Sequence, residues 1–223
     1  MTELEELSEK QLEKLKIDEL TNLFAEKINE HTQKLIEGIN YIITEDYDNF
    51  KKNMKYVIEP REELKIKKTF EHKIFKSKLM FSKADRLKVF SQINDIKNIV
   101  EFLANKLLIY RVILPDEDFK DRTKLILKYL KDLSEDITTA VKMISSDLTE
   151  AQEICEHIKD ERRKMRIEER HLLGLLWNYD MDYVSRTFLY LKELIEGIMM
   201  LSDHIKNFAE HIQFLATKYL IFR

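Results

Sequence analysis

The sequence contains very little glycine, proline and cysteine. Only 3 glycines and 2 prolines occur among its 223 residues. Sheets and long loops need more turn-forming residues than this, so the shortage favours helices joined by short connections. The single cysteine, Cys155, excludes a disulfide framework, and its position on an apolar line predicts a core side chain rather than a nucleophile.

Long apolar runs and a targeting segment are also missing. The uncharged apolar runs fall far short of the roughly 18 residues that would span a membrane. Residues 1–6 are acidic and have neither the basic start nor the apolar stretch of a signal peptide. We therefore expect a soluble cytoplasmic protein, peripheral to the inner face of the membrane at most.

Catalytic sequence motifs do not occur. There is no Walker loop, Rossmann fingerprint, Gly-x-Ser-x-Gly elbow or His-Glu-x-x-His sequence. Three glycines are too few to build a loop that cradles phosphate. These absences argue against the nucleotide-dependent and hydrolytic enzymes that carry such motifs, so we expect a protein that is not an enzyme and has no catalytic residues.

A regular apolar pattern is the main positive signal. Charged residues make up 35% of the chain and apolar residues 44%, which is enough for a core. Near the C-terminus, apolar residues alternate at spacings of four and three, which predicts a helix of roughly 50 Å packed lengthwise on other helices. This apolar line consists of Val184, Phe188, Leu191, Ile195, Ile198, Ser202, Ile205, Ala209, Ile212, Ala216 and Tyr219.

The same apolar line occurs 109 positions earlier (198 − 89), from Val89 to Tyr110. The polar residues around it repeat at the same offset, and a shared polar face is not required by packing alone. We interpret the repeat as an internal duplication. The corresponding positions are Asn94, Ile96, Lys97, Asn98 and Glu101 in the first half and Asp203, Ile205, Lys206, Asn207 and Glu210 in the second.

Shorter signals limit the helices of the first half. One helix is predicted from about residue 18 to 46, with Gly38 inside it closely packed by a neighbour. A second is predicted over 49–80, with a kink or a break near Pro60. Ser82 is a suitable cap for the third helix.

The second half repeats this organisation. Pro115 marks the boundary, and Asp147 with Glu150 is typical of a capping box that opens the fifth helix. The predicted fold class is all-α, with two tandem antiparallel three-helix bundles related by internal duplication and packed into one body. The predicted parts are an N-terminal extension (1–16), a first bundle (17–114) and a second bundle (115–223).

Charge is distributed unevenly along the chain. Residues 1–50 carry 5 basic and 13 acidic side chains, a net charge of −8, whereas residues 51–88 carry 13 basic and 5 acidic side chains, a net charge of +8. The basic segment could meet phosphate, an anionic membrane surface or an acidic partner. Alternatively, it lies beside the acidic helix that precedes it.

Possible metal ligands lie on the fifth and sixth helices. Carboxylates with one histidine suit Mg, Mn, Fe or Zn, and residues four apart project side by side from a helix. The alternative is a solvated charged face that the basic residues at 162–164 neutralise. The candidate ligands are Glu153, Glu156, His157, Asp160, Asp203 and Asn207, and the weaker first-half positions are Asn94 and Asn98.

With its duplicated polar motif and without a catalytic signature, the chain resembles the PhoU family. It is most similar to the PhoU-like proteins encoded beside Pit-type phosphate transporters. Residues 83–98 lie where that family carries Arg-Glu-Asp and then an acidic pair four apart, and residues 183–210 match the equivalent final helix. The resemblance covers roughly residues 20–220.

The resemblance implies a cytoplasmic regulator or accessory protein of phosphate transport, with a Pit-type transporter as partner. Many members of the family bind iron, zinc or similar cations through acidic residues four apart. The matching positions here are Asn94 with Asn98 and Asp203 with Asn207, and three of these four are amides, which are weaker ligands than carboxylates. A divalent or ferric metal ion is thus a possible cofactor.

Two alternatives stay open at this point. One is a dimeric helical adaptor or structural module unrelated to phosphate. The other is a ferritin-like metal protein, which needs paired Glu and Glu-x-x-His ligands that point into the bundle core, and that spacing does not occur at 153–157. No nucleic-acid partner is expected under any of these hypotheses.

Overall fold

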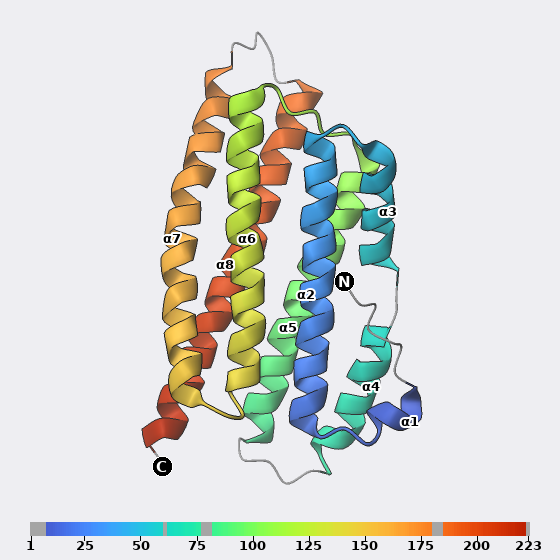
Figure 1. Cartoon of the computed structure of the whole chain (residues 1–223), viewed down its shortest axis with the longest axis vertical. Coiled ribbons are helices and arrows are strands. Elements are labelled where there is room, and N and C mark those ends of the chain that lie inside the picture. Colours follow the sequence, from blue (N-terminus) through green and yellow to red (C-terminus); the bar gives the residue numbers. More distant parts are fainter. Residues whose placement is uncertain (1–7, 60–61, 77–81, 180–184, 222–223) are drawn as a thin grey trace.

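The computed structural model describes residues 8–59, 62–76, 82–179 and 185–221. Within these ranges the chain forms eight α-helices and no strand (Figure 1). The predicted all-α fold class is therefore confirmed. The helices are α1 (Glu9–Leu12), α2 (Ile17–Ile43), α3 (Tyr47–Ile58), α4 (Glu62–Ile74), α5 (Lys83–Ile109), α6 (Glu117–Met143), α7 (Leu148–Asn178) and α8 (Arg186–Ile221).

Side-chain caps fix the starts of α5 and α7. The Oγ of Ser82 accepts a hydrogen bond from the backbone N–H of Asp85 at 3.1 Å. The Oδ1 of Asp147 accepts hydrogen bonds from the backbone N–H groups of Thr149 and Glu150, at 2.9 and 3.1 Å. These bonds satisfy N–H groups that have no partner within the first helical turn. Both predicted helix starts are confirmed.

The predicted second helix is two helices. α3 ends at Ile58, just before Pro60, and α4 begins at Glu62. A proline cannot donate a backbone hydrogen bond and restricts the residue before it, so the chain leaves helical geometry here. The predicted break is confirmed. Pro60 itself lies outside the described residues, as do the predicted helix end at Met80 and the first position of the C-terminal apolar line, Val184.

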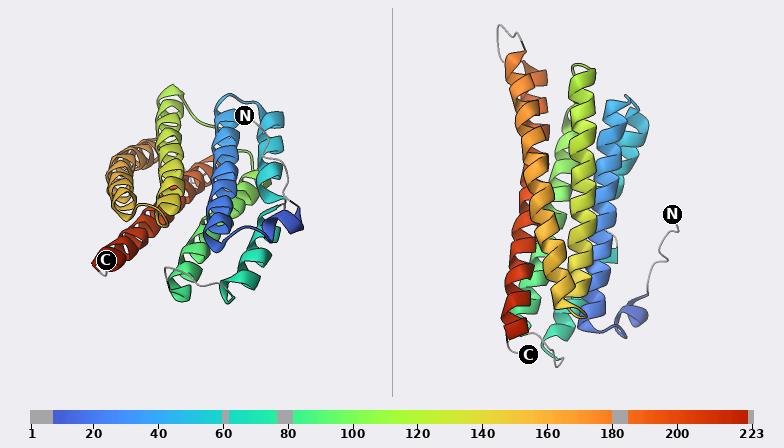
Figure 2. Two further views of the ribbon diagram at one scale, coloured as in Figure 1. Left: turned by 60° about the horizontal axis from the view of Figure 1, so that its bottom comes forward. Right: turned by 60° about the vertical axis from the view of Figure 1, so that its left-hand side comes forward.

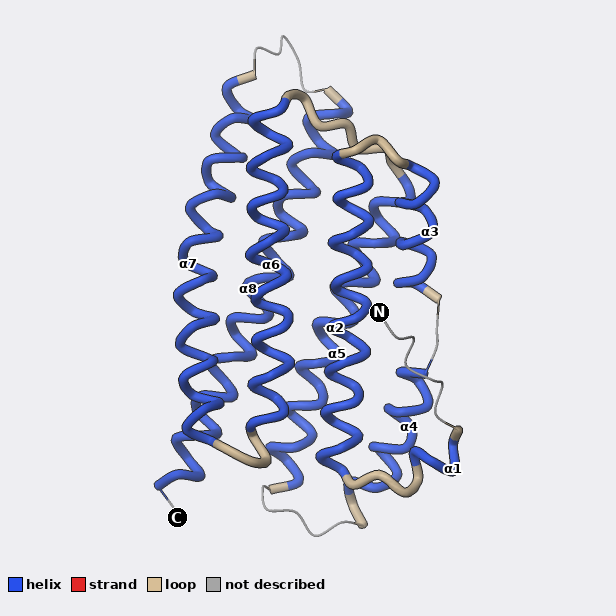
Figure 3. Tube along the Cα trace, viewed as in Figure 1, coloured by secondary structure: helices blue, strands red, loops and turns tan. Residues whose placement is uncertain are grey.

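The long helices lie side by side along the longest axis of the molecule (Figures 1 and 3). In the first half, α2 packs against α3, α4 and α5, and in the second half α7 packs against both α6 and α8. The halves meet through contacts of α2 with α6 and of α5 with α8. α7 lies at one edge of the body and α3 at the opposite edge (Figure 2). The boundary at residue 115 and the duplication itself stay predictions.

Both apolar lines face the core. Ile96 and Ile205, which occupy equivalent positions, are 5% and 0% exposed. Along α8 the line is buried from Phe188 to Ala216. Because these side chains recur at the spacing of a helix face, each helix can bury one full stripe against its neighbours.

Aromatic stacking and a glycine bring the helices of the first half close together. The Phe90 ring of α5 stacks against Phe24 of α2 and Phe70 of α4, with ring centroids 4.4 and 3.9 Å apart. At Gly38, a Cβ atom would lie 2.1 Å from the Cε of Met54 on α3. A side chain at this position would force the end of the Met54 side chain to move, which confirms the predicted close packing.

Contacts at both ends join α5 to α8. At one end, the rings of Tyr110 and Tyr190 stack with centroids 4.0 Å apart. At the other end, the carboxylate of Asp85 accepts hydrogen bonds from the Tyr219 hydroxyl at 2.5 Å and from the Lys218 ammonium at 2.8 Å. The two helices that carry the repeated apolar line are thus antiparallel neighbours.

Candidate functional site

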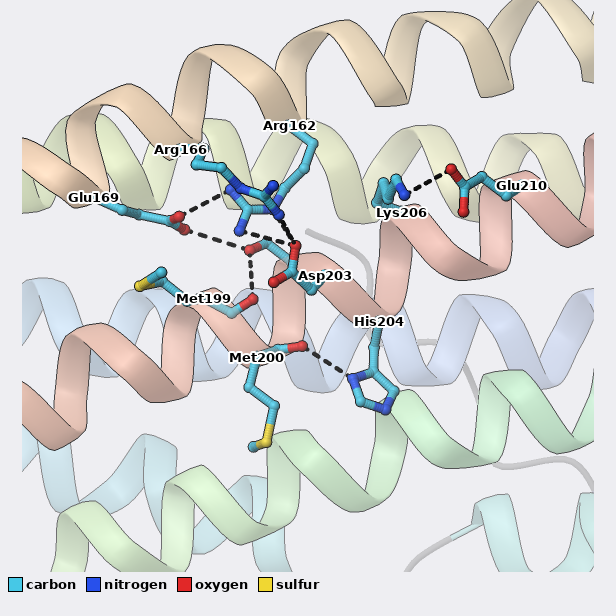
Figure 4. A network of polar contacts seen from close by, with 10 residues as sticks. Arg162, Arg166, Glu169, Met199, Met200, Asp203, His204, Lys206 and Glu210 are labelled. Carbon is cyan, nitrogen blue, oxygen red and sulfur yellow. Dashed lines mark hydrogen bonds and ion pairs between the residues drawn. The ribbon is translucent and has the colours of Figure 1, made fainter.

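A network of charged residues connects α7 to the polar face of α8 (Figure 4). The Oδ1 atom of Asp203 on α8 accepts hydrogen bonds from two guanidinium groups of α7. The distances are 3.0 Å to Nε of Arg162 and 2.7 Å to Nη2 of Arg166. Because two cations already flank this carboxylate, its negative charge is largely neutralised in the folded protein.

The inner part of this network is buried. Arg162 is 2% exposed and Glu169 is completely buried, with 2.9 Å between Nη1 of Arg162 and Oε2 of Glu169. Burial raises the pKa of the Glu169 carboxyl above its ordinary value, although the charge of Arg162 acts in the opposite direction. Loss of one charge from such a pair would leave the other charge buried without a partner, which strongly destabilises a fold.

Ser202, the polar exception in the C-terminal apolar line, lies next to this pair. Its Oγ atom lies 3.4 Å from Oε1 of Glu169 and donates a hydrogen bond to the backbone carbonyl of Met199 at 2.9 Å. A larger apolar side chain at this position would leave Glu169 with one polar contact fewer. The exception to the apolar pattern therefore follows from the buried carboxylate on α7.

The sequence contains a signal for the buried pair, although neither Arg162 nor Glu169 is among the predicted site residues. The core-facing residues of α7 follow the same four-three alternation as those of α8, and Arg162 and Glu169 occupy two of its positions. Charged residues on an otherwise apolar line indicate a buried ion pair. The line consists of Cys155, Ile158, Arg162, Met165, Glu169, Leu172 and Leu176.

The repeated polar face makes similar contacts in the two halves. The ion pair between Lys97 and Glu101 on α5, at 2.5 Å, corresponds to the pair between Lys206 and Glu210 on α8, at 2.6 Å. Asn94, the equivalent of Asp203, accepts a hydrogen bond from Lys67 of α4 at 3.4 Å. In both halves a basic side chain from the preceding helix thus contacts the same position, which is an amide in one half and a carboxylate in the other.

The predicted ligands on α7 point to different neighbours. Glu156 contacts Lys159, at 2.7 Å, and the amide of Gln213, whereas His157 Nδ1 lies 2.8 Å from Oδ2 of Asp136 on α6. The carboxylate of Asp160 accepts a hydrogen bond from Arg163 at 2.7 Å. Glu153 is exposed on the same helix. The α7 set is thus distributed over separate contacts rather than around one point.

The candidate metal ligands do not converge on one point in the described residues. No group of three or more His, Cys, Asp or Glu side chains in the described ranges is placed to hold one. Asn98 and Asn207 are exposed, and a cation at Asp203 would compete with two guanidinium groups. A ferritin-like centre would also require several converging carboxylates in the core. Metal binding by these residues stays a prediction.

A second polar cluster lies between α2 and α4. The ammonium of Lys27 lies 3.1 Å from the carboxylate of Glu62 and 3.5 Å from that of Glu30. His31, on the same helix, is 1% exposed, and burial lowers the pKa of its imidazole. His31 is therefore neutral at pH 7, and its ring meets the Tyr56 ring edge-on, with centroids 5.8 Å apart.

The thiol of Cys155 is part of the core, as its place on an apolar line predicts. The side chain is completely buried, and burial raises the pKa of the thiol to about 12. A thiol in such surroundings stays protonated at neutral pH and is a poor nucleophile. This finding confirms the predicted core position of the single cysteine.

In the part of the chain that the structure describes, no helix is both long and apolar enough to cross a membrane.

No protein-family model matches the sequence, and no curated protein matches it in sequence. Solved structures do match its fold. A putative PhoU-like phosphate regulatory protein from Shewanella oneidensis MR-1 superposes with a TM-score of 0.75 and 12% identity, covering 91% of this chain and all of the other.

A second solved structure, a PhoU-like protein from the same organism, gives a TM-score of 0.74, also at 12% identity. The match covers 90% of this chain and 96% of that protein. Because the match includes nearly the whole of both chains, the order and packing of the long helices are shared, and not only one bundle. This chain therefore has the fold of PhoU-like proteins.

Proposed function

We propose that this chain is a non-enzymatic regulator or accessory protein of inorganic phosphate transport that acts by binding a phosphate transporter. The observation that carries the proposal is the fold match, which extends over the full length of a PhoU-like phosphate regulatory protein. The partner that we expect is a Pit-type transporter, bound at the cytoplasmic face of the membrane.

The chemistry of the polar network supports binding rather than catalysis. The charged groups of α7 and α8 contact one another, so Asp203 is held by two arginines and Glu169 by one. Fixed charges on a rigid helix pair suit recognition of a partner surface. The outer part of this face, with Lys206 and Glu210, is only partly covered and presents alternating charge (Figure 4).

Two measurements test the role in phosphate transport. The tagged full-length chain should co-purify with a Pit-type transporter from detergent-solubilised membranes, and deletion of its gene should change the uptake of radiolabelled phosphate. The intact gene should restore uptake in the deletion strain. The absence of association together with unchanged uptake would rule out the proposal.

Charge exchange on α8 tests whether the repeated polar face is the contact surface. The double variant K206E/E210K keeps the net charge and the pairing at four residues' separation but reverses its direction. Lys192 and Glu196 form a similarly exposed pair on the same helix, at 2.8 Å, so K192E/E196K is the matched control. We expect K206E/E210K alone to weaken co-purification by about tenfold or more, because like charges then meet across the interface. Equal effects of the two variants would contradict this location.

A further inference from the structure

A basic groove separates α4 from the segment that joins α1 to α2. Its volume is about 990 Å³, and its walls carry six lysines against three carboxylates. One of these carboxylates, Asp18, forms an ion pair with the buried Arg86 of α5. The guanidinium group of Arg86 therefore neutralises much of the negative charge of Asp18. The groove therefore has a clear excess of positive charge and lies outside the α7–α8 network.

Lysines line both walls of the groove. Lys14 and Lys16 come from the α1–α2 segment and Lys68 from α4, and all three are exposed. Within the described ranges none of these three ammonium groups forms an ion pair with an acidic side chain. Like charges that face one another across a concavity repel, so their arrangement favours an anion between them.

One further lysine holds the two walls together. The ammonium of Lys73 on α4 donates hydrogen bonds to the backbone carbonyls of Glu13 and Leu15, the latter at 2.6 Å. These bonds attach the α1–α2 segment to α4. The groove is therefore built by specific contacts between two parts of the chain.

The shape of the groove indicates the size of its ligand. Lys65 and Lys73 lie eight positions apart on α4, which is about 12 Å of helix, and Lys76 extends this basic wall just beyond the end of α4. A volume of about 990 Å³ is near the upper end for small-molecule sites and much larger than one phosphate ion needs. Ammonium groups bind phosphate oxygens well as point charges.

We propose that the groove between α4 and the α1–α2 segment binds a soluble, elongated anion that carries several phosphate groups. The inference stands on the groove alone and does not require the proposed role in phosphate transport. A concave site with lysines on two walls encloses such an anion, whereas a flat anionic membrane would reach only the rims.

Titration calorimetry with the full-length chain and inorganic tripolyphosphate tests this proposal. The variant K14Q/K68Q removes one charge from each wall. The variant K51Q/K52Q removes the same charge from exposed positions on α3, outside the groove, and is the matched control. We expect K14Q/K68Q to bind tripolyphosphate about tenfold or more weakly than the wild type, because contacts to a charged group are lost. The control should stay within about twofold, and rising salt should weaken binding by the wild type.

Several results would overturn the proposal. Equal weakening in the two double variants would mean that only the net charge matters. Orthophosphate binding as tightly as tripolyphosphate would exclude a ligand with several phosphates. Binding to phosphatidylglycerol vesicles without binding to tripolyphosphate would assign the groove to a membrane surface, and no measurable binding of tripolyphosphate at 50 mM salt would remove the site. Circular dichroism melts of each variant serve as the control that the fold is retained. Because these readouts use purified protein, they are independent of transporter association and phosphate uptake.

Discussion

Arg162 and Glu169 lie seven residues apart on α7 and form an ion pair inside the core, with 2.9 Å between Nη1 and Oε2. Both side chains are at most 2% exposed. Two turns of helix separate their Cα atoms, so both side chains project from the face that packs on α8. The pair thus belongs to the interface between α7 and α8 that also carries Asp203. We therefore expect removal of one partner of the pair to destabilise the packing of these two helices.

The first prediction concerns this pair. The substitution Arg162→Met leaves Glu169 buried without its partner, and we expect it to lower the free energy of unfolding by about 3–5 kcal/mol. The double variant R162M/E169L removes both charges and should recover most of the loss. Urea unfolding measures both values. Arg163→Met, at an exposed neighbouring position, is the control and should cost less than about 0.5 kcal/mol. If the double variant loses as much free energy of unfolding as R162M, the cost does not come from leaving Glu169 buried without its partner, and the prediction is wrong.

The second prediction is the effect of pH through His31. Burial lowers the pKa of this imidazole in the folded protein below its ordinary value of 6.5, so between the two values the unfolded chain binds more protons. The contribution of His31 to stability is therefore fully present above pH 6.5 and decreases as the pH falls through and below this value. We expect His31→Gln to lose less stability than the wild type between pH 7.5 and 5.5, measured by urea unfolding.

The charged neighbours of His31 and a second, half-buried histidine affect the interpretation of this experiment. The carboxylates of Glu63, Glu30 and Glu101 favour the protonated imidazole, whereas Lys97 opposes it. Burial also lowers the pKa of His211, but that residue is present in both proteins and its contribution cancels. The exposed His204 supplies the control variant, His204→Gln. Identical pH dependence of the wild type and His31→Gln would disprove the assignment.

The third prediction compares two glycines within helices. At Gly174 on α7 no atom lies within 4 Å of an added Cβ, so Gly174→Ala should stabilise the protein by about 1 kcal/mol through helix propensity. At Gly38 the same change places Cβ 2.1 Å from Met54 Cε, and the resulting overpacking of about 1–3 kcal/mol should offset or exceed that gain. Thermal unfolding of the two variants gives the comparison. An equal rise in Tm for both would mean that Met54 moves aside without cost.

The fourth prediction concerns metal content. Because Asp203 is held by Arg162 and Arg166, and the other candidate ligands contact separate partners, we expect purified protein to contain well under one metal ion per chain. Inductively coupled plasma mass spectrometry after dialysis measures this content. One or more tightly held ions per chain would require the α7–α8 face to rearrange. In that case Asp203→Asn should release the metal, and Asp160→Asn should show whether α7 contributes.

Much of the fold could be predicted from the sequence because its signals are local. The break before Pro60 and the caps at Ser82 and Asp147 each depend on residues near one another in the chain. The alternating apolar spacing likewise identifies the buried face of α8 without knowledge of its neighbours.

The site could not be predicted to the same extent because its character depends on contacts between helices. An acidic residue such as Asp203 has the same local pattern whether it meets a metal ion or the guanidinium groups of α7. Only the packing of α7 on α8 places Arg162 and Arg166 against it. The buried position of His31 is a similar case, since it depends on how α3 and α4 cover α2.

The contacts between α5 and α8 at both ends restrict the conformational changes that a partner could induce. Tyr110 meets Tyr190 at one end, and Tyr219 meets Asp85 at the other. A hinge that opened at either end would have to break the attachment there. We therefore expect α5 and α8 to shift together when a partner binds, because relative motion of the two halves would cost these contacts.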